Sequence, residues 1–227
     1  SINDPYSDKF QYGNVYDTNI YTTEGLPSNY GVGTRQSNLQ CNFDTGVTLE
    51  FWLKKPGWVE DDSPEVVFDL WTSGSYSGSA DYGRLTVQVD DNKFLLTVQS
   101  GSTAAKLNNQ EIGQSINTTL LSDWNHFALV LYNTGSNFVS KLYLNGVLND
   151  TKEEPTSSIG DAFGQFKQKD TFGRIGAYLT APSGALDVLD AHLLDGANKL
   201  TGSMDEFRFW KEKRSAQDIG RYWFTQV

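Results

Sequence analysis

The feature that most constrains the fold of this chain is a strict alternation of apolar and other side chains that begins at residue 47. Four apolar residues occupy every second position there: Val47, Leu49, Phe51 and Leu53. Successive side chains of a β-strand point to opposite faces of the sheet, so this period predicts a strand with one buried face. Further apolar runs of strand length follow at 66–71, 84–89, 93–99, 126–132, 141–144, 147–148, 171–178 and 200–210.

Turn signals separate these runs. Asn145-Gly146 is the clearest, and it predicts a hairpin because both residues tolerate a positive φ. Only 215–222 favours a helix, since Ser215 can cap its first turn and Asp218 suits the dipole there. Many short strands joined by turns predict an all-β sandwich or barrel with one short C-terminal helix.

Length and composition fit a single domain, which we place at 1–227. Its first part, 1–34, is rich in tyrosine and broken by glycine and proline, and we expect an irregular arm packed on the domain. The single cysteine, Cys41, cannot form an internal disulfide and is interpreted as a small buried residue. Because the chain begins at Ser1 rather than Met, we expect it to be either processed or excised from a longer protein.

The charge of the chain limits its partners. The net charge is −10, and no cluster of Lys and Arg forms a basic face, so a nucleic-acid partner is not expected. No apolar run approaches the roughly 20 residues that span a bilayer, so membrane insertion is not expected. An acidic surface does leave carboxylates available for divalent cations.

Five motifs, in this order along the chain, resemble the laminin-G-like and concanavalin A-like jelly rolls: 43–52, 124–130, 142–146, 173–176 and 202–219. The second opens with Trp124-Asn125-His126, and the third ends with Asn145-Gly146. This resemblance implies a two-sheet antiparallel jelly-roll sandwich. Within the family, the motifs most resemble modules in virion proteins of tailed phages, especially phages of marine bacteria. The resemblance thus implies an extracellular or virion-surface location.

Catalysis is not expected. The resemblance includes glucanases, whose catalytic strand reads E-x-D-x-x-E, and this string is absent from the chain. Retaining hydrolysis needs two carboxyl groups about 5–5.5 Å apart on one face. Asp205 and Glu206 are adjacent on a predicted strand and should therefore point to opposite faces.

A structural calcium ion is one expectation, and Asp205 is its first candidate ligand. Asp205 shares strand parity with Phe207 and Phe209, so we expect it to face the core, where a carboxylate needs a partner. The resemblance implies Ca²⁺ held by this aspartate and by carbonyl groups of the N-terminal segment. The alternative is a carboxylate that accepts N–H bonds from the arm. Asp187 and Asp190, in the acidic loop 182–198, are further metal candidates, with a solvated loop as their alternative.

Carbohydrate binding needs an aromatic platform with polar groups at its edges, because a sugar ring has an apolar face and a rim of hydroxyls. Loop residues offer both features, and the candidates are Trp58, Asp61, Asp62, Tyr76, Asp81 and Tyr82. The alternative is that these rings cover the edges of the sandwich. Tryptophans within the strand regions, Trp52 and Trp124 among them, are interpreted as structural. His126 is expected to pack within its strand.

These observations favour a non-catalytic module that binds a carbohydrate or a cell surface and belongs to a larger extracellular or virion protein. Its partner would be a glycan or glycoconjugate. The alternative is a structural or decoration domain that contacts neighbouring proteins in a phage particle or fibre. A polysaccharide-cleaving enzyme comes third, because the carboxylate string is missing.

Overall fold

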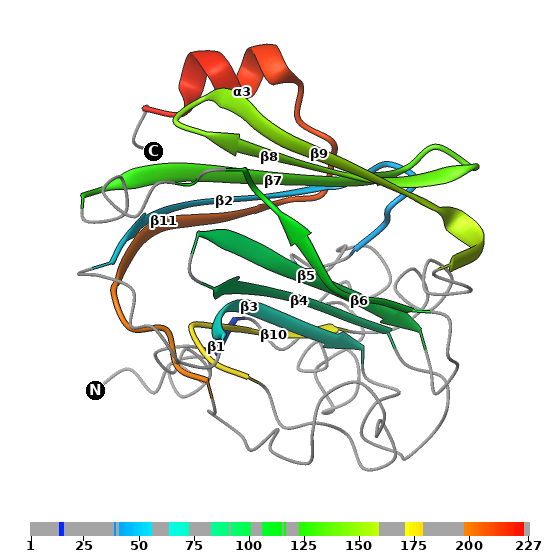
Figure 1. The fold of residues 1–227 in the computed structure, drawn as a ribbon, viewed down its shortest axis with the longest axis horizontal. Coiled ribbons are helices and arrows are strands. Elements are labelled where there is room, and N and C mark those ends of the chain that lie inside the picture. The colour runs from blue at the N-terminus through cyan, green and yellow to red at the C-terminus, as the bar shows by residue number, and fades with distance from the viewer. Residues whose placement is uncertain are drawn as a thin grey trace, which may run out of the picture.

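The computed structural model consists of two antiparallel β-sheets that face each other (Figure 1). It describes residues 14–15, 39, 41–55, 64–72, 83–90, 92–100, 106–114, 116, 123–158, 171–178 and 198–224. The predicted two-sheet jelly-roll sandwich is confirmed. No helix in these ranges is long and apolar enough to cross a membrane.

The six-stranded sheet contains, in spatial order, β1 (Asn14–Val15), β10 (Thr171–Ile175), β3 (Glu65–Thr72), β4 (Gly83–Asp90), β5 (Lys93–Ser100) and β6 (Lys106–Ile112). The five-stranded sheet contains β11 (Ser203–Trp210), β2 (Val47–Lys54), β7 (Asn125–Asn133), β8 (Asn137–Leu144) and β9 (Val147–Pro155). A 3₁₀ turn, η5 (Thr156–Ser158), follows β9, and one helix, α3 (Ala216–Tyr222), is described near the C-terminus.

The core lies between the two sheets, and the alternation in β2 supplies part of it. Its four apolar residues are at most 1% exposed, as the period of two predicts. Phe51 lies 5.7 Å from Phe127 of β7 and 6.0 Å from Phe94 of β5, measured between ring centroids. Aromatic contacts therefore join the two sheets. Cys41 is buried as expected, and its burial raises the pKa of the thiol.

The local signals for the hairpin and the helix are both confirmed. Asn145 and Gly146 have φ angles of 49° and 79°, the left-handed pair of a type I′ turn between β8 and β9. The Ser215 side chain accepts a hydrogen bond from the Asp218 amide at 3.1 Å, so Ser215 caps α3. The helix buries Ile219 against the outer face of the five-stranded sheet.

Two elements differ from the sequence expectations or extend them. Strand β6 is not predicted by its sequence, because it pairs on one side only and buries few apolar side chains, among them Leu107 and Ile112. Of the expected arm 1–34, the structure describes Asn14–Val15 alone, and these residues pair with β10 as strand β1. The other residues of the arm lie outside the described ranges.

Candidate functional site

A β-bulge in β11 decides where the acidic residues of this strand point. Asp205 pairs with Trp52 and Arg208 pairs with Glu50, so two residues of β11 face the single residue Phe51. Glu206 adopts a φ of 51° at this point. A bulge inserts one extra residue and inverts the side-chain parity of the strand beyond it.

The expectation that Asp205 faces the core is therefore wrong. Phe207 packs inward, with its ring stacked 6.4 Å from that of Phe51. Asp205, two residues earlier, lies on the other side of the bulge and is exposed. Its Oδ1 accepts a hydrogen bond from the Glu206 amide at 2.8 Å. The alternation had placed Asp205 and Phe207 on one face, and the bulge separates them.

The outward turn of Asp205 completes a pocket on the outer face of the five-stranded sheet. Its volume is about 210 Å³, and its described lining residues are Trp52, Trp124, Asp205 and Glu206. Trp52 lies on β2, between β11 and β7, and is half-buried. Trp124 lies one residue before β7 and is 40% exposed. The pocket therefore combines two indole rings with two carboxylates. The expectation that Asp205 and Glu206 point to opposite faces is wrong, because the bulge brings both residues to the lining of one pocket.

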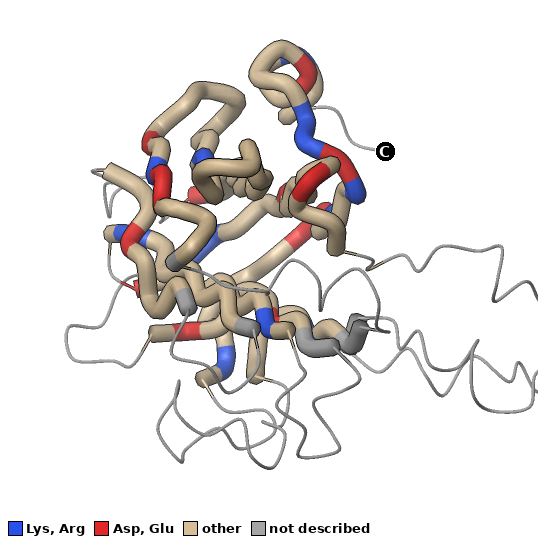
Figure 2. The backbone as a smooth tube through the Cα atoms, turned by 90° about the vertical axis from the view of Figure 1, so that its right-hand side faces the viewer, with Lys and Arg blue, Asp and Glu red and all other residues tan. Residues whose placement is uncertain are grey.

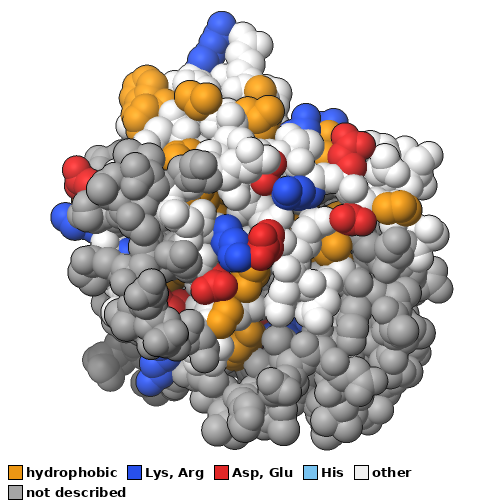
Figure 3. All heavy atoms as spheres, viewed as in Figure 1, with side chains coloured by type: hydrophobic (Ala, Val, Ile, Leu, Met, Phe, Trp, Pro, Cys, Tyr) orange, Lys and Arg blue, Asp and Glu red, His pale blue; other side chains and the backbone are white. Residues whose placement is uncertain are grey.

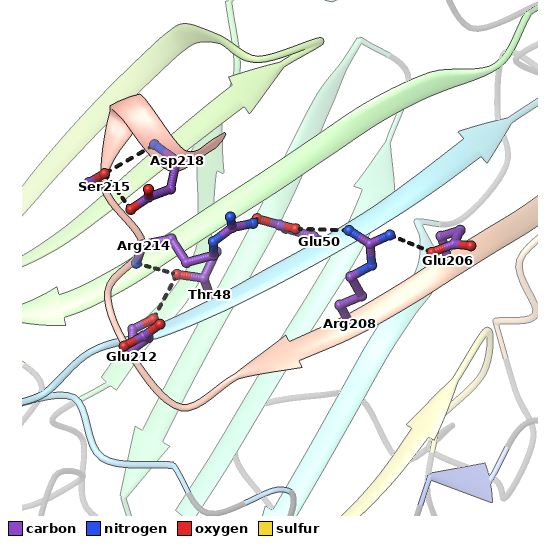
Figure 4. Close-up of polar contacts among 8 residues, drawn as sticks. All are labelled: Thr48, Glu50, Glu206, Arg208, Glu212, Arg214, Ser215 and Asp218. Carbon is purple, nitrogen blue, oxygen red and sulfur yellow. Dashed lines mark hydrogen bonds and ion pairs between the residues drawn. The ribbon is translucent and has the colours of Figure 1, made fainter. Parts of the chain in front are cut away.

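The carboxylate of Glu206 is held by an ionic network beneath the pocket (Figure 4). Arg208 Nη2 donates to Glu206 Oε2 at 2.5 Å, and Arg208 Nη1 lies 3.8 Å from Glu50 Oε2. Glu50 is 1% exposed, and its other oxygen accepts from Arg214. The Arg214 guanidinium lies over the Trp210 ring, 4.5 Å from its centroid. Buried Glu50 thus anchors both arginines, and one of them orients Glu206.

The ring of Trp52 is held in place by aromatic neighbours. The ring of Trp52 lies 5.6 Å from His126 and 5.7 Å from Trp223, which follows α3. Burial, together with the charges of Arg208 and Arg214, lowers the pKa of His126 to about 4. The imidazole is therefore neutral at pH 7, and it packs within its strand as expected. Trp52 presents a rigid ring to the pocket.

A second polar cluster lies on the six-stranded sheet. Arg84 Nε lies 3.2 Å from Asp69 Oδ1, and Thr86 donates to the same oxygen at 2.5 Å. Asp69, Arg84 and Thr86 are fully buried. The Arg84 guanidinium also lies 5.2 Å from the ring centroid of Tyr178, and burial raises the pKa of Tyr178 to about 12. These contacts tie β3 to β4.

Most of the predicted site residues cannot be compared with this geometry. Those outside the described ranges are Trp58, Asp61, Asp62, Tyr76, Asp81, Tyr82, Asp187 and Asp190. Within the described ranges, no group of three or more His, Cys, Asp or Glu side chains could hold a metal ion. Calcium binding by Asp205 with partners elsewhere stays a prediction.

Two of the pocket residues, Trp52 and Trp124, were not predicted from the sequence. Both were interpreted as structural, and Trp124 is instead a prominent exposed aromatic. One signal was present, because Trp52 occupies an outward position in the alternation of β2. A large aromatic ring on the face that points away from the core is a candidate ligand platform. Nothing in the sequence indicated that Asp205 and Trp124 would meet it there.

A sequence model of the concanavalin A-like lectin/glucanases superfamily matches residues 28–220. The chain belongs to this superfamily. The resemblance to laminin-G-like and concanavalin A-like jelly rolls is thereby confirmed. No sequence among the curated proteins matches the chain.

Solved structures with the same fold include the carbohydrate-binding module CBM40 of the Ruminococcus gnavus IT-sialidase. Its structure bound to α2,3 sialyllactose has a TM-score of 0.52 and 12% identity, over 84% of this chain and 86% of the module. The structure bound to α2,6 sialyllactose has a TM-score of 0.51 and 12% identity, over the same 84% and 86%. At this identity, the similarity shows a shared fold.

Proposed function

We propose that this chain is a non-catalytic carbohydrate-binding module, and that the pocket formed by Trp52, Trp124, Asp205 and Glu206 is its sugar site. The observation that carries the proposal is the meeting of two indole rings and two carboxylates in one pocket. An indole face packs against the apolar face of a sugar ring, and carboxylate oxygens accept hydrogen bonds from hydroxyls. The superfamily and the fold shared with a carbohydrate-binding module support a binding role.

The dimensions of the pocket suit a small ligand. Its 210 Å³ is below the roughly 300–1,000 Å³ of pockets for drug-sized ligands, so it suits a ligand about the size of one sugar ring. A single shallow site of this kind binds weakly, with a Kd near 1 mM and a binding free energy of roughly −4 kcal/mol. Many copies on a cell surface or virion would raise the avidity. We therefore propose that the module acts as part of a larger extracellular or virion protein.

A non-catalytic role is the better proposal because of how the two carboxylates are held. Glu206 is bound to Arg208, and Asp205 accepts the amide of its own neighbour. Glycosidases place their two carboxyl groups on opposite sides of the scissile bond. Consecutive residues at one wall of a pocket do not provide that arrangement. Incubation with polysaccharides should release no new reducing ends, and their appearance would overturn this part of the proposal.

Trp124→Ala tests the sugar site directly. Removing the exposed indole should weaken glycan binding at least about fivefold, the equivalent of roughly 1 kcal/mol. The matched control is Tyr222→Ala, which removes an exposed aromatic ring from α3 and should leave affinity unchanged. Binding is measured by calorimetry with a glycan that a panel screen identifies, with calcium and again with chelator. Equal affinity of wild type and Trp124→Ala would refute the assignment of the site.

A structural or decoration role is the second candidate, and an exposed apolar surface favours it. Val147 and Leu148 at the start of β9 are 69% and 49% exposed, and Tyr222 and Phe224 at the end of α3 are 49% and 64% exposed. The ring of Trp223 packs at Gly146 and brings the two segments together. Figure 3 shows hydrophobic side chains gathered at the end of the molecule where α3 lies. Such a surface suits contact with a neighbouring protein.

A further inference from the structure

The pocket has an asymmetric charge, and this narrows the class of sugar it can take. No lysine or arginine is among its described lining residues, whereas two carboxylates are. Elsewhere in the described part of the chain, acidic and basic positions are interspersed (Figure 2). The pocket is therefore a local concentration of negative charge next to two indole rings.

The two carboxylates are not equivalent. Glu206 is paired with Arg208, whose Nη1 also lies 3.8 Å from buried Glu50, and Arg214 contacts the other carboxylate oxygen of Glu50. Asp205 forms no ion pair within the described residues, and its Oδ1 accepts a hydrogen bond from the neutral Glu206 amide. The exposed carboxylate of Asp205 thus leaves one negative charge in the pocket uncompensated.

The two indole rings favour a cationic ligand, as the uncompensated carboxylate of Asp205 does. An indole ring has an electric quadrupole whose negative part lies over its face, so the face attracts a cation within about 6 Å of the ring centroid. A site with two indole rings and an uncompensated carboxylate favours a ligand that has a positive charge on a compact, partly apolar body. It disfavours a ligand with a carboxylate of its own, because like charges would be brought together in a partly desolvated space.

We propose that this pocket selects glycans that carry a protonated amino group, and that it discriminates against acidic sugars. The inference rests on the proposed function, because it names the sugar class for the same pocket. Asp205 forms an ion pair with the sugar ammonium group, and Trp52 and Trp124 contact its ring. Arg208 keeps Glu206 in place and prevents a second uncompensated charge. The preferred ligand therefore differs in charge from the acidic sialyllactose bound in two solved structures of the same fold.

The test compares three ligands of similar size: a glucosamine trimer, the N-acetylglucosamine trimer and sialyllactose. Binding to the whole chain is measured by calorimetry at about pH 6, where a sugar amine is protonated and carboxylates are ionised. The glucosamine trimer should bind at least about fivefold tighter than its acetylated counterpart, and sialyllactose should bind weakest. The preference should shrink as salt is raised, because the Debye length falls from roughly 10 Å at 0.1 M to about 3 Å at 1 M.

Asp205→Asn should remove the preference for the amine, so that the two trimers bind with affinities within about twofold of each other. Glu212→Gln is the matched control. It also removes one negative charge from an exposed position. Among the residues drawn in Figure 4, Glu212 and Glu206 lie at opposite ends. This control should keep the full preference. Melting temperatures of both variants show that each is folded.

The outcomes separate this inference from the proposed function. Equal binding of the two trimers, with both lost in Trp124→Ala, would overturn the amine preference and leave the sugar site in place. Tighter binding of sialyllactose, or an unchanged preference in Asp205→Asn, would also overturn the inference. Failure of every sugar to bind would overturn both.

Discussion

Arg214→Met tests the ionic network beneath the pocket, and its cost follows from the burial of Glu50. Removing one partner of a buried ion pair costs about 3–5 kcal/mol, because an uncompensated charge is left behind. Glu50 keeps Arg208, however, with Nη1 3.8 Å from its Oε2. At an effective dielectric constant of about 20, that contact is worth roughly 4 kcal/mol of gross attraction. The expected loss in unfolding free energy is therefore about 3 kcal/mol, at the lower end of the range.

A second contribution to the loss in unfolding free energy comes from the Trp210 ring, over which the Arg214 guanidinium lies. A partly exposed cation–π contact of this kind is worth about 0.5–1 kcal/mol. Methionine keeps most of the side-chain packing and loses only the charged contacts. For a chain of this length, each kcal/mol lowers the melting temperature by about 2–4 °C, so a total loss of about 3.5–4 kcal/mol should make Arg214→Met melt roughly 7–16 °C below wild type.

The assay is urea denaturation of four proteins: wild type, Glu50→Gln, Arg214→Met and the double variant. Because Glu50→Gln removes the charge that Arg214 neutralises, the second substitution should cost less in its presence. We expect a coupling free energy of at least about 1.5 kcal/mol. Arg221→Met, an arginine exposed on α3, is the matched control and should change stability by less than about 0.5 kcal/mol. Additive single costs, or an Arg214→Met variant as stable as this control, would refute the argument.

Two further predictions concern His126 and the β8–β9 turn. The folded pKa of His126, about 4, lies below its unfolded value near 6.5, so the unfolded chain takes up the proton first as pH falls. Stability should therefore decline between pH 6.5 and 4 by up to about 3 kcal/mol, and His126→Gln should remove that part of the decline in urea melts at each pH. Gly146→Ala should destabilise the fold by about 2 kcal/mol or more, because its Cβ would lie 2.3 Å from the Trp223 ring. Gly135→Ala, also at positive φ but with nothing within 4 Å, should cost about 1 kcal/mol, and equal losses would contradict the proposed steric contact.

Much of the fold could be predicted from local pattern. The alternation from residue 47 indicated which side chains of β2 face the core, because strand geometry alternates regardless of what the strand pairs with. Asn145-Gly146 and the Ser215 cap could be predicted for the same reason. Each depends on the φ preference or hydrogen bonding of a few neighbouring residues. Such signals are local, and they are complete in the sequence.

The candidate site could not be predicted in this way, because it depends on register and on contacts across long sequence separations. The sequence pattern placed Asp205 toward the core, and a single bulge at Glu206 turned it outward beside Trp52. Trp124 reaches the same pocket from the segment before β7. A one-residue change in pairing inverts every side chain beyond it, and alternation alone does not reveal where that change occurs.

The burial of Glu50 shows the same division between sequence and tertiary structure. Its position in β2 indicated an outward, solvent-facing carboxylate, and the outward direction is correct. The segment after β11 crosses that face, where the Arg214 amide donates to Thr48 Oγ1 at 3.1 Å and its guanidinium contacts Glu50. The alternating sequence by itself determined which face of the strand each side chain occupies. Only the tertiary structure decided whether that face meets water, because the residues that cover it lie more than 160 positions away.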